Sequence, residues 1–213
     1  TAAQNAVAKL LNAAGTAPRG AGIDLPEGQM EALYQLATGV GNVVANVSNI
    51  PANTMGIGGA GFRKGALPVV TMITDAIFHT KGEPATSCTI RLSTGGTQTV
   101  LTDYAGATAT AAHTRAETHA ALNKICAKVV GVSALRTTMT NAVTDPNGIC
   151  SGTADLVAAA NATGAVVLPA AWDFGARPAG CASGQCCTGL NGTGEAPNAN
   201  GECPLVFKIA QDG

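Results

Sequence analysis

Aromatic and charged residues are scarce in this chain. Of its 213 residues, only 3% are Phe, Trp or Tyr and 12% are charged, and the formal net charge is -1. The chain has no basic run that would favour nucleic-acid binding and no acidic run typical of a charged tail. It also has no apolar stretch near the roughly 20 residues that a membrane-spanning helix requires. We therefore expect one domain of generous size, with a core of Ala, Val, Leu and Ile.

Zinc-ligand patterns are missing as well. None of the seven cysteines forms a C-x-x-C pair, and His113 and His119 lie six positions apart, where we expect solvated or half-buried polar groups. Disulfides in an oxidising compartment explain the cysteines better. Cys126, at the end of an apolar helix, is the expected buried free thiol. The disulfide candidates are Cys88, Cys150, Cys181, Cys186, Cys187 and Cys203.

The most informative segment is the apolar run from Val69 to Ile73, which Pro68 opens. Such a run predicts a strand that is buried on both faces, as in parallel sheets covered by helices. Thr74 and Asp75 follow directly, at the end of a strand where ligands bind in open α/β sheets. Two interpretations of Asp75 remain open: it is a ligand for a hard cation, or it caps the next helix or turn.

The remaining periodicity predicts alternating helices and strands. We expect helices from about residue 27 to Gly39, over 103–125, and from a cap at Thr153 to Gly164, and strands over 127–133, 165–168 and 203–209. This order predicts an α/β fold with a doubly wound, mainly parallel sheet. The composition changes near residue 170. We therefore divide the chain into an α/β domain, 1–169, and a Cys-rich, disulfide-stapled segment, 170–213, that ends in a strand.

A glycine-rich stretch, Gly56-Ile-Gly-Gly-Ala-Gly61, matches the letters of the dinucleotide fingerprint G-x-G-x-x-G. That fingerprint works only between a strand and the N-terminus of a helix, where the helix end holds a pyrophosphate. Here the glycines follow a loop and precede the predicted strand at Val69. We therefore interpret the stretch as a flexible loop.

Two further stretches carry a family resemblance. Residues 24–35 read D-L-P-E-G-Q-M-E-A-L-Y-Q, and residues 70–79 read V-T-M-I-T-D-A-I-F-H. They resemble signature stretches of von Willebrand factor A domains, closest to the integrin β I-like branch, and Gly61-Phe-Arg-Lys is similar to a third. The resemblance spans roughly residues 24–168. It implies a Rossmann-like fold with a metal-ion-dependent adhesion site at the carboxyl rim of the sheet, as in secreted bacterial proteins of this family.

The resemblance also implies roles for four residues. Glu27 would be a direct metal ligand, and Asp75, after Thr74, would hold the metal directly or through water. Asp24 would serve a neighbouring calcium site. These oxygen donors suit Mg²⁺ or Ca²⁺. One open metal position would take a carboxylate from a protein partner, and such sites bind without catalysis, so we do not expect an enzyme.

The chain departs from the family at its beginning. The family's first loop, D-x-S-x-S after the first strand, is missing, and Gly22 stands where the integrin branch has Asn. We expect a chain already processed or excerpted, which alone retains little or no metal and whose sheet another chain completes. The expected function is extracellular or cell-surface adhesion or assembly through the metal rim. The alternative is a structural subunit with a vestigial metal site, held by disulfides and neighbouring chains.

Overall fold

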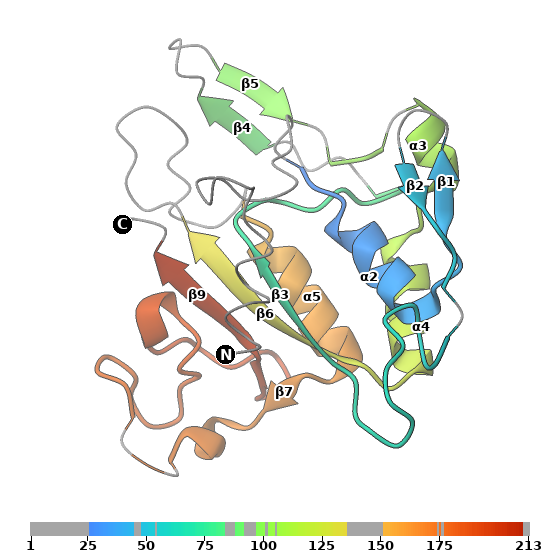
Figure 1. The fold of residues 1–213 in the computed structure, drawn as a ribbon. Coiled ribbons are helices and arrows are strands. Elements are labelled where there is room, and N and C mark those ends of the chain that lie inside the picture. The colour runs from blue at the N-terminus through green and yellow to red at the C-terminus, as the bar shows by residue number, and fades with distance from the viewer. Residues whose placement is uncertain are drawn as a thin grey trace, which may run out of the picture.

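Three parallel strands form the central sheet of the computed structural model (Figure 1). β3 (Val69–Thr74) pairs with β6 (Lys128–Leu135), and β6 pairs with β9 (Val206–Ala210). The register places Thr74 beside Ser133 at the carboxyl end. The structure describes residues 26–44, 48–53, 55–83, 88–91, 97–100, 102–104, 106–135, 151–173, 175 and 177–210.

The other elements lie around this sheet. The helices are α2 (Gln29–Thr38), α3 (Gly106–Ala111), α4 (Arg115–Lys124) and α5 (Thr153–Thr163), with 3-10 turns η1 (Pro169–Asp173) and η2 (Leu190–Gly192). Three antiparallel pairs are β1 (Asn42–Val44) with β2 (Ser48–Ile50), β4 (Cys88–Arg91) with β5 (Thr97–Val100), and β7 (Val166–Val167) with β8 (Cys203–Pro204). None of the helices in the described part of the chain is long and apolar enough to cross a membrane.

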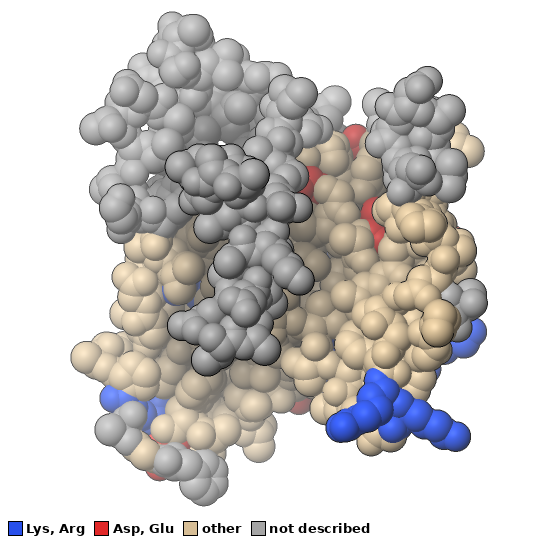
Figure 2. Space-filling view, in the orientation of Figure 1, with Lys and Arg blue, Asp and Glu red and all other residues tan. Residues whose placement is uncertain are grey.

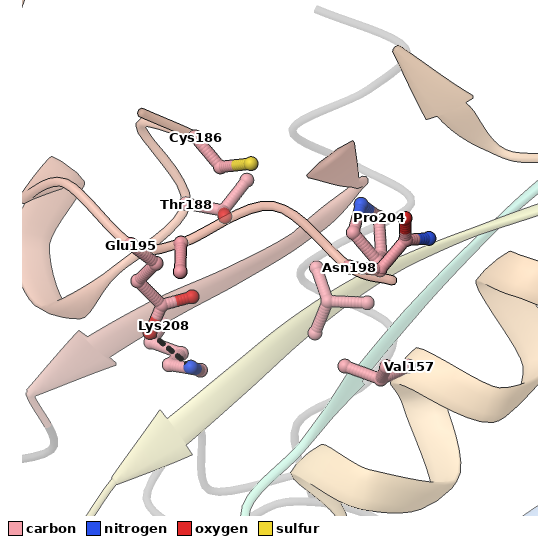
Figure 3. A pocket seen from close by; sticks show the side chains of 9 residues that line it. Val157, Cys186, Thr188, Glu195, Asn198, Pro204 and Lys208 are labelled. Carbon is pink, nitrogen blue, oxygen red and sulfur yellow. Dashed lines mark hydrogen bonds and ion pairs between the residues drawn. The ribbon is translucent and has the colours of Figure 1, made fainter. Parts of the chain in front are cut away.

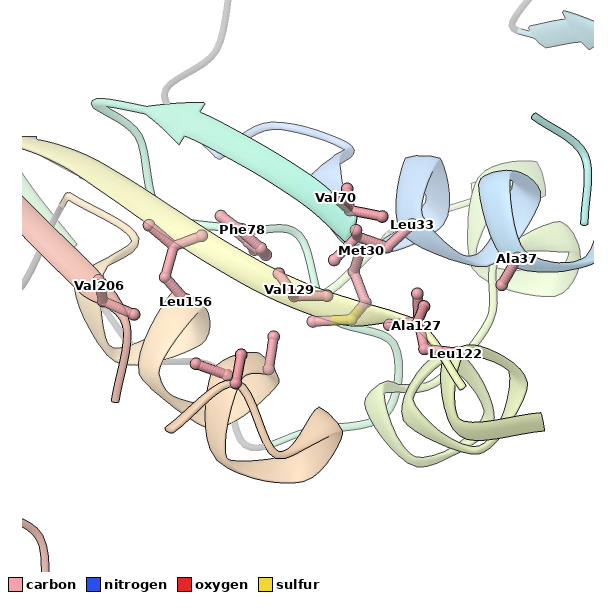
Figure 4. Close-up of a cluster of buried hydrophobic side chains, with 13 residues drawn as sticks. Met30, Leu33, Ala37, Val70, Phe78, Leu122, Ala127, Val129, Leu156 and Val206 are labelled. Atoms are coloured by element: carbon pink, nitrogen blue, oxygen red, sulfur yellow. The ribbon is translucent and has the colours of Figure 1, made fainter. Parts of the chain in front are cut away.

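One face of the sheet packs against α2, α4 and α5 (Figure 4). The sheet contributes Val70, Val129 and Val206 to this core, one from each strand. The helices contribute Met30, Leu33, Ala37, Leu122, Leu156, Ala159 and Ala160. Burial of this apolar surface is the main stabilising contribution to the fold. The α/β class with a mainly parallel sheet is confirmed.

The prediction that the central strand is buried on both faces is wrong. Val70 and Thr74 point to the helices and are buried, but Val69 is 52% exposed and Ile73 is 71% exposed. Successive side chains of a strand point to opposite faces, so the second face of β3 is the exposed one. The helices of the described residues that join the core lie on the first face.

The single helix expected over 103–125 is divided in two. α3 ends at Ala111, and α4 begins at Arg115 with a complete capping box. The Thr114 hydroxyl accepts from the Glu117 N–H at 3.2 Å, and the Glu117 carboxylate accepts from the Thr114 N–H at 2.8 Å. A threonine that caps a helix this way offers the backbone an alternative to continuing the preceding helix.

The third strand of the sheet also differs from the prediction. β7 lies within the expected range 165–168, but it pairs antiparallel with β8 outside the central sheet. The C-terminal strand β9 takes the third place, so the Cys-rich segment is joined to the α/β sheet. The cap of α5 is Gly152, with Thr153 as the first helical residue, which corrects the cap predicted at Thr153.

Two disulfides hold the C-terminal segment. They join Cys181 to Cys187 and Cys186 to Cys203. Cys126 is free, as predicted, but it is exposed, because it follows the last turn of α4 with a positive φ of 56°. The other two candidates, Cys150 and the side chain of Cys88, lie outside the described residues.

Candidate cation site at the carboxyl end of the sheet

The segment before α2 lies against the loop that follows β3. Glu27 forms a parallel bridge with Phe78. Its N–H donates to the Ile77 carbonyl at 3.0 Å, and its carbonyl accepts from the His79 N–H at 2.8 Å. These backbone bonds bring together two segments about fifty positions apart and set the start of α2 at the carboxyl end of β3.

Gln29 joins the side chains of the two segments. Its Nε2 donates to Glu27 Oε2 at 2.9 Å and to Thr74 Oγ1 at 2.8 Å. Thr74 is further fixed because its hydroxyl accepts from the Ala76 N–H at 3.1 Å and donates to the Ala76 carbonyl at 3.2 Å. We call Glu27, Gln29, Thr74 and Asp75 the rim cluster.

The structure thus brings together Glu27 and Thr74 among the residues that the sequence suggested. Asp75 lies one residue beyond β3 and is half-buried, whereas Glu27 is exposed. Asp24 lies outside the described residues. Within the described residues no group of three or more His, Cys, Asp or Glu side chains is arranged to hold a metal. A cation here would therefore rely on two carboxylates and on neutral oxygens.

The sequence patterns did not point to Gln29. Glutamine is a common helix former, and its position in the first turn of α2 carries no metal-binding signal by itself. The only signal in the sequence was that Gln29 is a polar residue two positions after Glu27. Its burial became apparent only from the fold.

A network of ion pairs supports the loop of the rim. The Phe78 N–H donates to Asp155 Oδ2 at 3.1 Å, and Arg115 Nη2 donates to Asp155 Oδ1 at 2.6 Å. Arg115 also binds both carboxylate oxygens of Glu83, at 2.6 and 2.9 Å. Burial opposes the charge of Arg115, but its hydrogen bonds to the Glu83 and Asp155 carboxylates outweigh this effect and raise the pKa of the guanidinium.

The start of α5 packs directly against the same loop. Gly152 has a φ of 68°, and a Cβ at this position would lie 2.3 Å from the Ala76 carbonyl oxygen. Only glycine allows both this backbone conformation and this approach. The close contact with the start of α5 therefore fixes the position of the loop that carries Asp75.

A second polar network lies on α2. The buried Glu31 carboxylate accepts from the His113 N–H at 3.0 Å and from its Nδ1 at 2.9 Å, and also from Gln35 and Asn42. The His113 ring stacks on Tyr34 at 3.5 Å. Burial alone would raise the pKa of Glu31, but these hydrogen bonds and the charge of His113 lower it. As predicted, both His113 and His119 are half-buried.

Charge is unevenly distributed over this face of the molecule. Figure 2 shows acidic atoms between the tan surfaces in the upper half, near the start of α2 in Figure 1, and a few others near the lower end. The larger groups of Lys and Arg atoms lie at the lower end. This distribution favours a cation at the carboxyl rim.

A separate cavity of about 200 Å³ lies between α5, β9 and the Cys-rich segment (Figure 3). Its wall is mostly apolar, with Val157, Pro204 and Val206. Two charged side chains in it, Glu195 and Lys208, form an ion pair with each other. This pairing leaves the cavity less suited to a charged ligand than the rim.

The glycine-rich stretch packs against the C-terminal end of α2, whereas phosphate binding requires the N-terminal end of a helix. The Gly59 N–H donates to the Leu36 carbonyl at 2.8 Å, near the C-terminus of α2. Carbonyl oxygens at this helix end repel an anion. The stretch is thus a loop, as predicted, and it packs on the C-terminal end of α2.

Comparison with known proteins gave no relative. No protein-family model, no curated protein and no solved structure matches this chain.

Proposed function

We propose that the rim cluster binds Mg²⁺ or Ca²⁺ and that the bound cation captures a carboxylate of a protein partner. In this proposal the chain is a binding module for adhesion or assembly, of the von Willebrand factor A type, and not an enzyme. The two disulfides among the described residues are compatible with an oxidising compartment, so we place the chain outside the cell or at its surface.

One observation carries this proposal. Glu27 and Thr74 are 47 positions apart in sequence (74 − 27), yet a single amide group contacts both side chains. The two stretches that resemble the adhesion-site loops therefore meet at one edge of the sheet. Had they lain at opposite ends, a shared cation would have been impossible.

The residues fit a hard cation. Glu27 and Asp75 would supply carboxylate oxygens, which are the donors that Mg²⁺ and Ca²⁺ prefer. The Thr74 hydroxyl already accepts from Gln29 and Ala76 and donates to Ala76, so it would orient Gln29 instead of binding the cation. When bound, the cation supplies a positive centre for an acidic side chain of the partner. The Arg115–Asp155 pair and Gly152 hold the loop after β3, so that Asp75 keeps its place relative to Glu27.

Titration calorimetry with Mg²⁺ and Ca²⁺ tests this proposal. The protein to use is the gene product read from its start codon, because the first metal loop of the family is not in this chain. We expect saturable binding that is lost in the Glu27→Ala/Asp75→Ala double variant. Equal heats from the wild type and this variant would refute the proposal.

The exposed face of β3 favours a second candidate function. Val69, Ile73 and the preceding Leu67 are more than half exposed. In the described part of the chain, β3 has a paired neighbour on one side only. Strands of parallel sheets are rarely left so open, and an open edge pairs readily with another chain. The chain would then be a structural subunit whose sheet a neighbouring polypeptide completes.

The two candidates differ in what assembly requires. If the chain is a structural subunit, its assembly with other chains persists in the Glu27→Ala/Asp75→Ala variant and in a chelator. If the cation captures the partner, both treatments abolish assembly. Analytical ultracentrifugation of the gene product with its copurifying chains distinguishes these results.

A further inference from the structure

The amide of Gln29 has one buried polar atom that no described protein group satisfies. Gln29 is 9% exposed, and its Oε1 accepts no hydrogen bond among the described residues. Its Nε2 is fully used, because it donates to both Glu27 and Thr74. Most buried acceptors in folded proteins bind a protein donor, an ordered water, an ion or a ligand.

The orientation of this amide is fixed by its neighbours. If oxygen and nitrogen exchanged places, the oxygen would face the Glu27 carboxylate, and the NH₂ group would be left without an acceptor. Oε1 is bonded to the same carbon as Nε2, so it belongs to the rim cluster. The unsatisfied acceptor is thus two bonds from the nitrogen that donates to Glu27, the expected metal ligand.

We infer that Gln29 Oε1 is itself a ligand of the rim cation. This inference rests on the proposed function and adds a residue that the family resemblance does not supply. Side-chain amide oxygens are regular ligands of Ca²⁺, together with carboxylates. Nε2 positions Glu27 at the same time, so one side chain provides a ligand and orients another.

Gln29→Met tests this role, with Gln35→Met as the matched control. Gln35 lies on the same helix and is 7% exposed. Its Nε2 donates to Glu31 at 2.7 Å, and its Oε1 accepts from the Gly41 N–H at 2.8 Å, so both its polar atoms are satisfied. Each substitution removes one buried amide from α2, but only the first removes the unsatisfied oxygen.

Ca²⁺ affinity by calorimetry and the Ca²⁺-induced rise in Tm are measured on the gene product. We expect Gln29→Met to weaken Ca²⁺ binding about tenfold or more and to reduce the rise in Tm. Gln35→Met should keep the wild-type affinity although its own Tm without Ca²⁺ is lower. Gln29→Glu, which retains a side-chain oxygen, should still bind Ca²⁺.

Different results overturn the two proposals. If Gln29→Met binds Ca²⁺ as the wild type does while Glu27→Gln does not, the ligand role of Gln29 is wrong and the cation site remains. Gln29→Glu keeps a side-chain oxygen but lacks the Nε2 donor. Loss of Ca²⁺ binding in this variant would assign the effect to the positioning of Glu27 and contradict the ligand role of Oε1, even if the methionine variant fails to fold. A wild-type protein without Ca²⁺ binding overturns both the site and the role of Gln29.

Discussion

Several buried or half-buried charged residues near the rim cluster are stabilised by hydrogen-bond and ion-pair partners from distant parts of the chain. Glu31 is buried in α2 and satisfied by four donors, and Arg115 is shared between Glu83 and Asp155. A buried charge is tolerated only when it is paired in this way. Removing one partner leaves the other charge in a poorly hydrated place, so these residues should dominate the response to single substitutions.

Glu31 makes stability depend on acid pH. Its pKa is lowered from 4.5 in the folded protein, so its contribution is present above 4.5 and is lost as the pH falls through the folded value. We expect Glu31→Gln to lower the free energy of unfolding by about 2 kcal/mol at pH 7. Below pH 4.5 the difference from the wild type should shrink.

Urea unfolding between pH 3 and 7, in steps of about one unit, measures this dependence. Glu202→Gln in the C-terminal segment controls for the removal of a negative charge. A Glu31→Gln defect of the same size at every pH would contradict the role given to this carboxylate.

Arg115 should matter more than an exposed arginine. Arg115→Met leaves Asp155 and Glu83 without their cation, and we expect a loss of about 2 kcal/mol, less than for a fully buried pair because solvent partly screens these groups. Arg63→Met, at an exposed position, should cost less than about 0.5 kcal/mol. Equal midpoints of urea unfolding for the two variants would show that the ion-pair network adds nothing.

At the scale of the elements, the approach of α5 to the loop after β3 is set by one glycine. Gly152 and Gly82 have nearly the same φ, 68° and 70°, but a Cβ at Gly82 would meet nothing within 4 Å. Gly82→Ala therefore tests backbone strain alone, and Gly152→Ala tests strain plus a collision with the Ala76 carbonyl.

We expect Gly82→Ala to cost about 1 kcal/mol and Gly152→Ala about 3 kcal/mol. Because the collision displaces the loop that carries Asp75, Gly152→Ala should also weaken cation binding, and Gly82→Ala should not. Thermal unfolding and calorimetry measure the two effects. If both alanine variants lost similar amounts of stability and cation affinity, the predicted collision between α5 and the loop after β3 would be absent.

Elements were predictable where local chemistry decides them. Helical spacing and the stop at Gly39 predicted α2, and Gly164 correctly ends α5. The break between α3 and α4 was missed because the alanine-rich pattern continues across it. The Thr114 capping box begins a new helix at that point. The exposed face of β3 was missed because an unbroken apolar run does not reveal what lies against each face.

For the whole molecule, both described disulfides lie within the C-terminal segment, and one of them holds the chain just before β9. Cys203 immediately precedes the turn into β9, and its bridge to Cys186 closes a loop with a sequence separation of 17. The bridge between Cys181 and Cys187 closes a loop with a separation of only 6. Longer closed loops restrict the unfolded chain more.

We expect Cys186→Ser/Cys203→Ser to lose about 3 kcal/mol and Cys181→Ser/Cys187→Ser about 2 kcal/mol. The first variant should also lose protection from hydrogen exchange in β9, because that strand would be released at its start. Urea unfolding and exchange measured by mass spectrometry check both results. Unchanged protection in β9 would argue that packing on β6 alone holds the strand.

The candidate site was predictable only in part. Two short stretches indicated Glu27, Thr74 and Asp75, because their residue types and order resemble an adhesion site. The contribution of Gln29 depends on which of its atoms the fold buries, and the Arg115–Asp155 support joins residues 40 positions apart. Such long-range contacts leave no local pattern in the sequence.

Anomalous diffraction from crystals of the gene product grown with Mn²⁺ tests the rim site most directly. Mn²⁺ takes the same oxygen ligands as Mg²⁺ and can be located by its anomalous signal. We predict a peak at the carboxyl end of β3, within about 2.5 Å of oxygens from Glu27 and Gln29 and beside Asp75. Crystals with Mn²⁺ bound only elsewhere, or with no peak at a saturating Mn²⁺ concentration, would contradict a cation site at this rim.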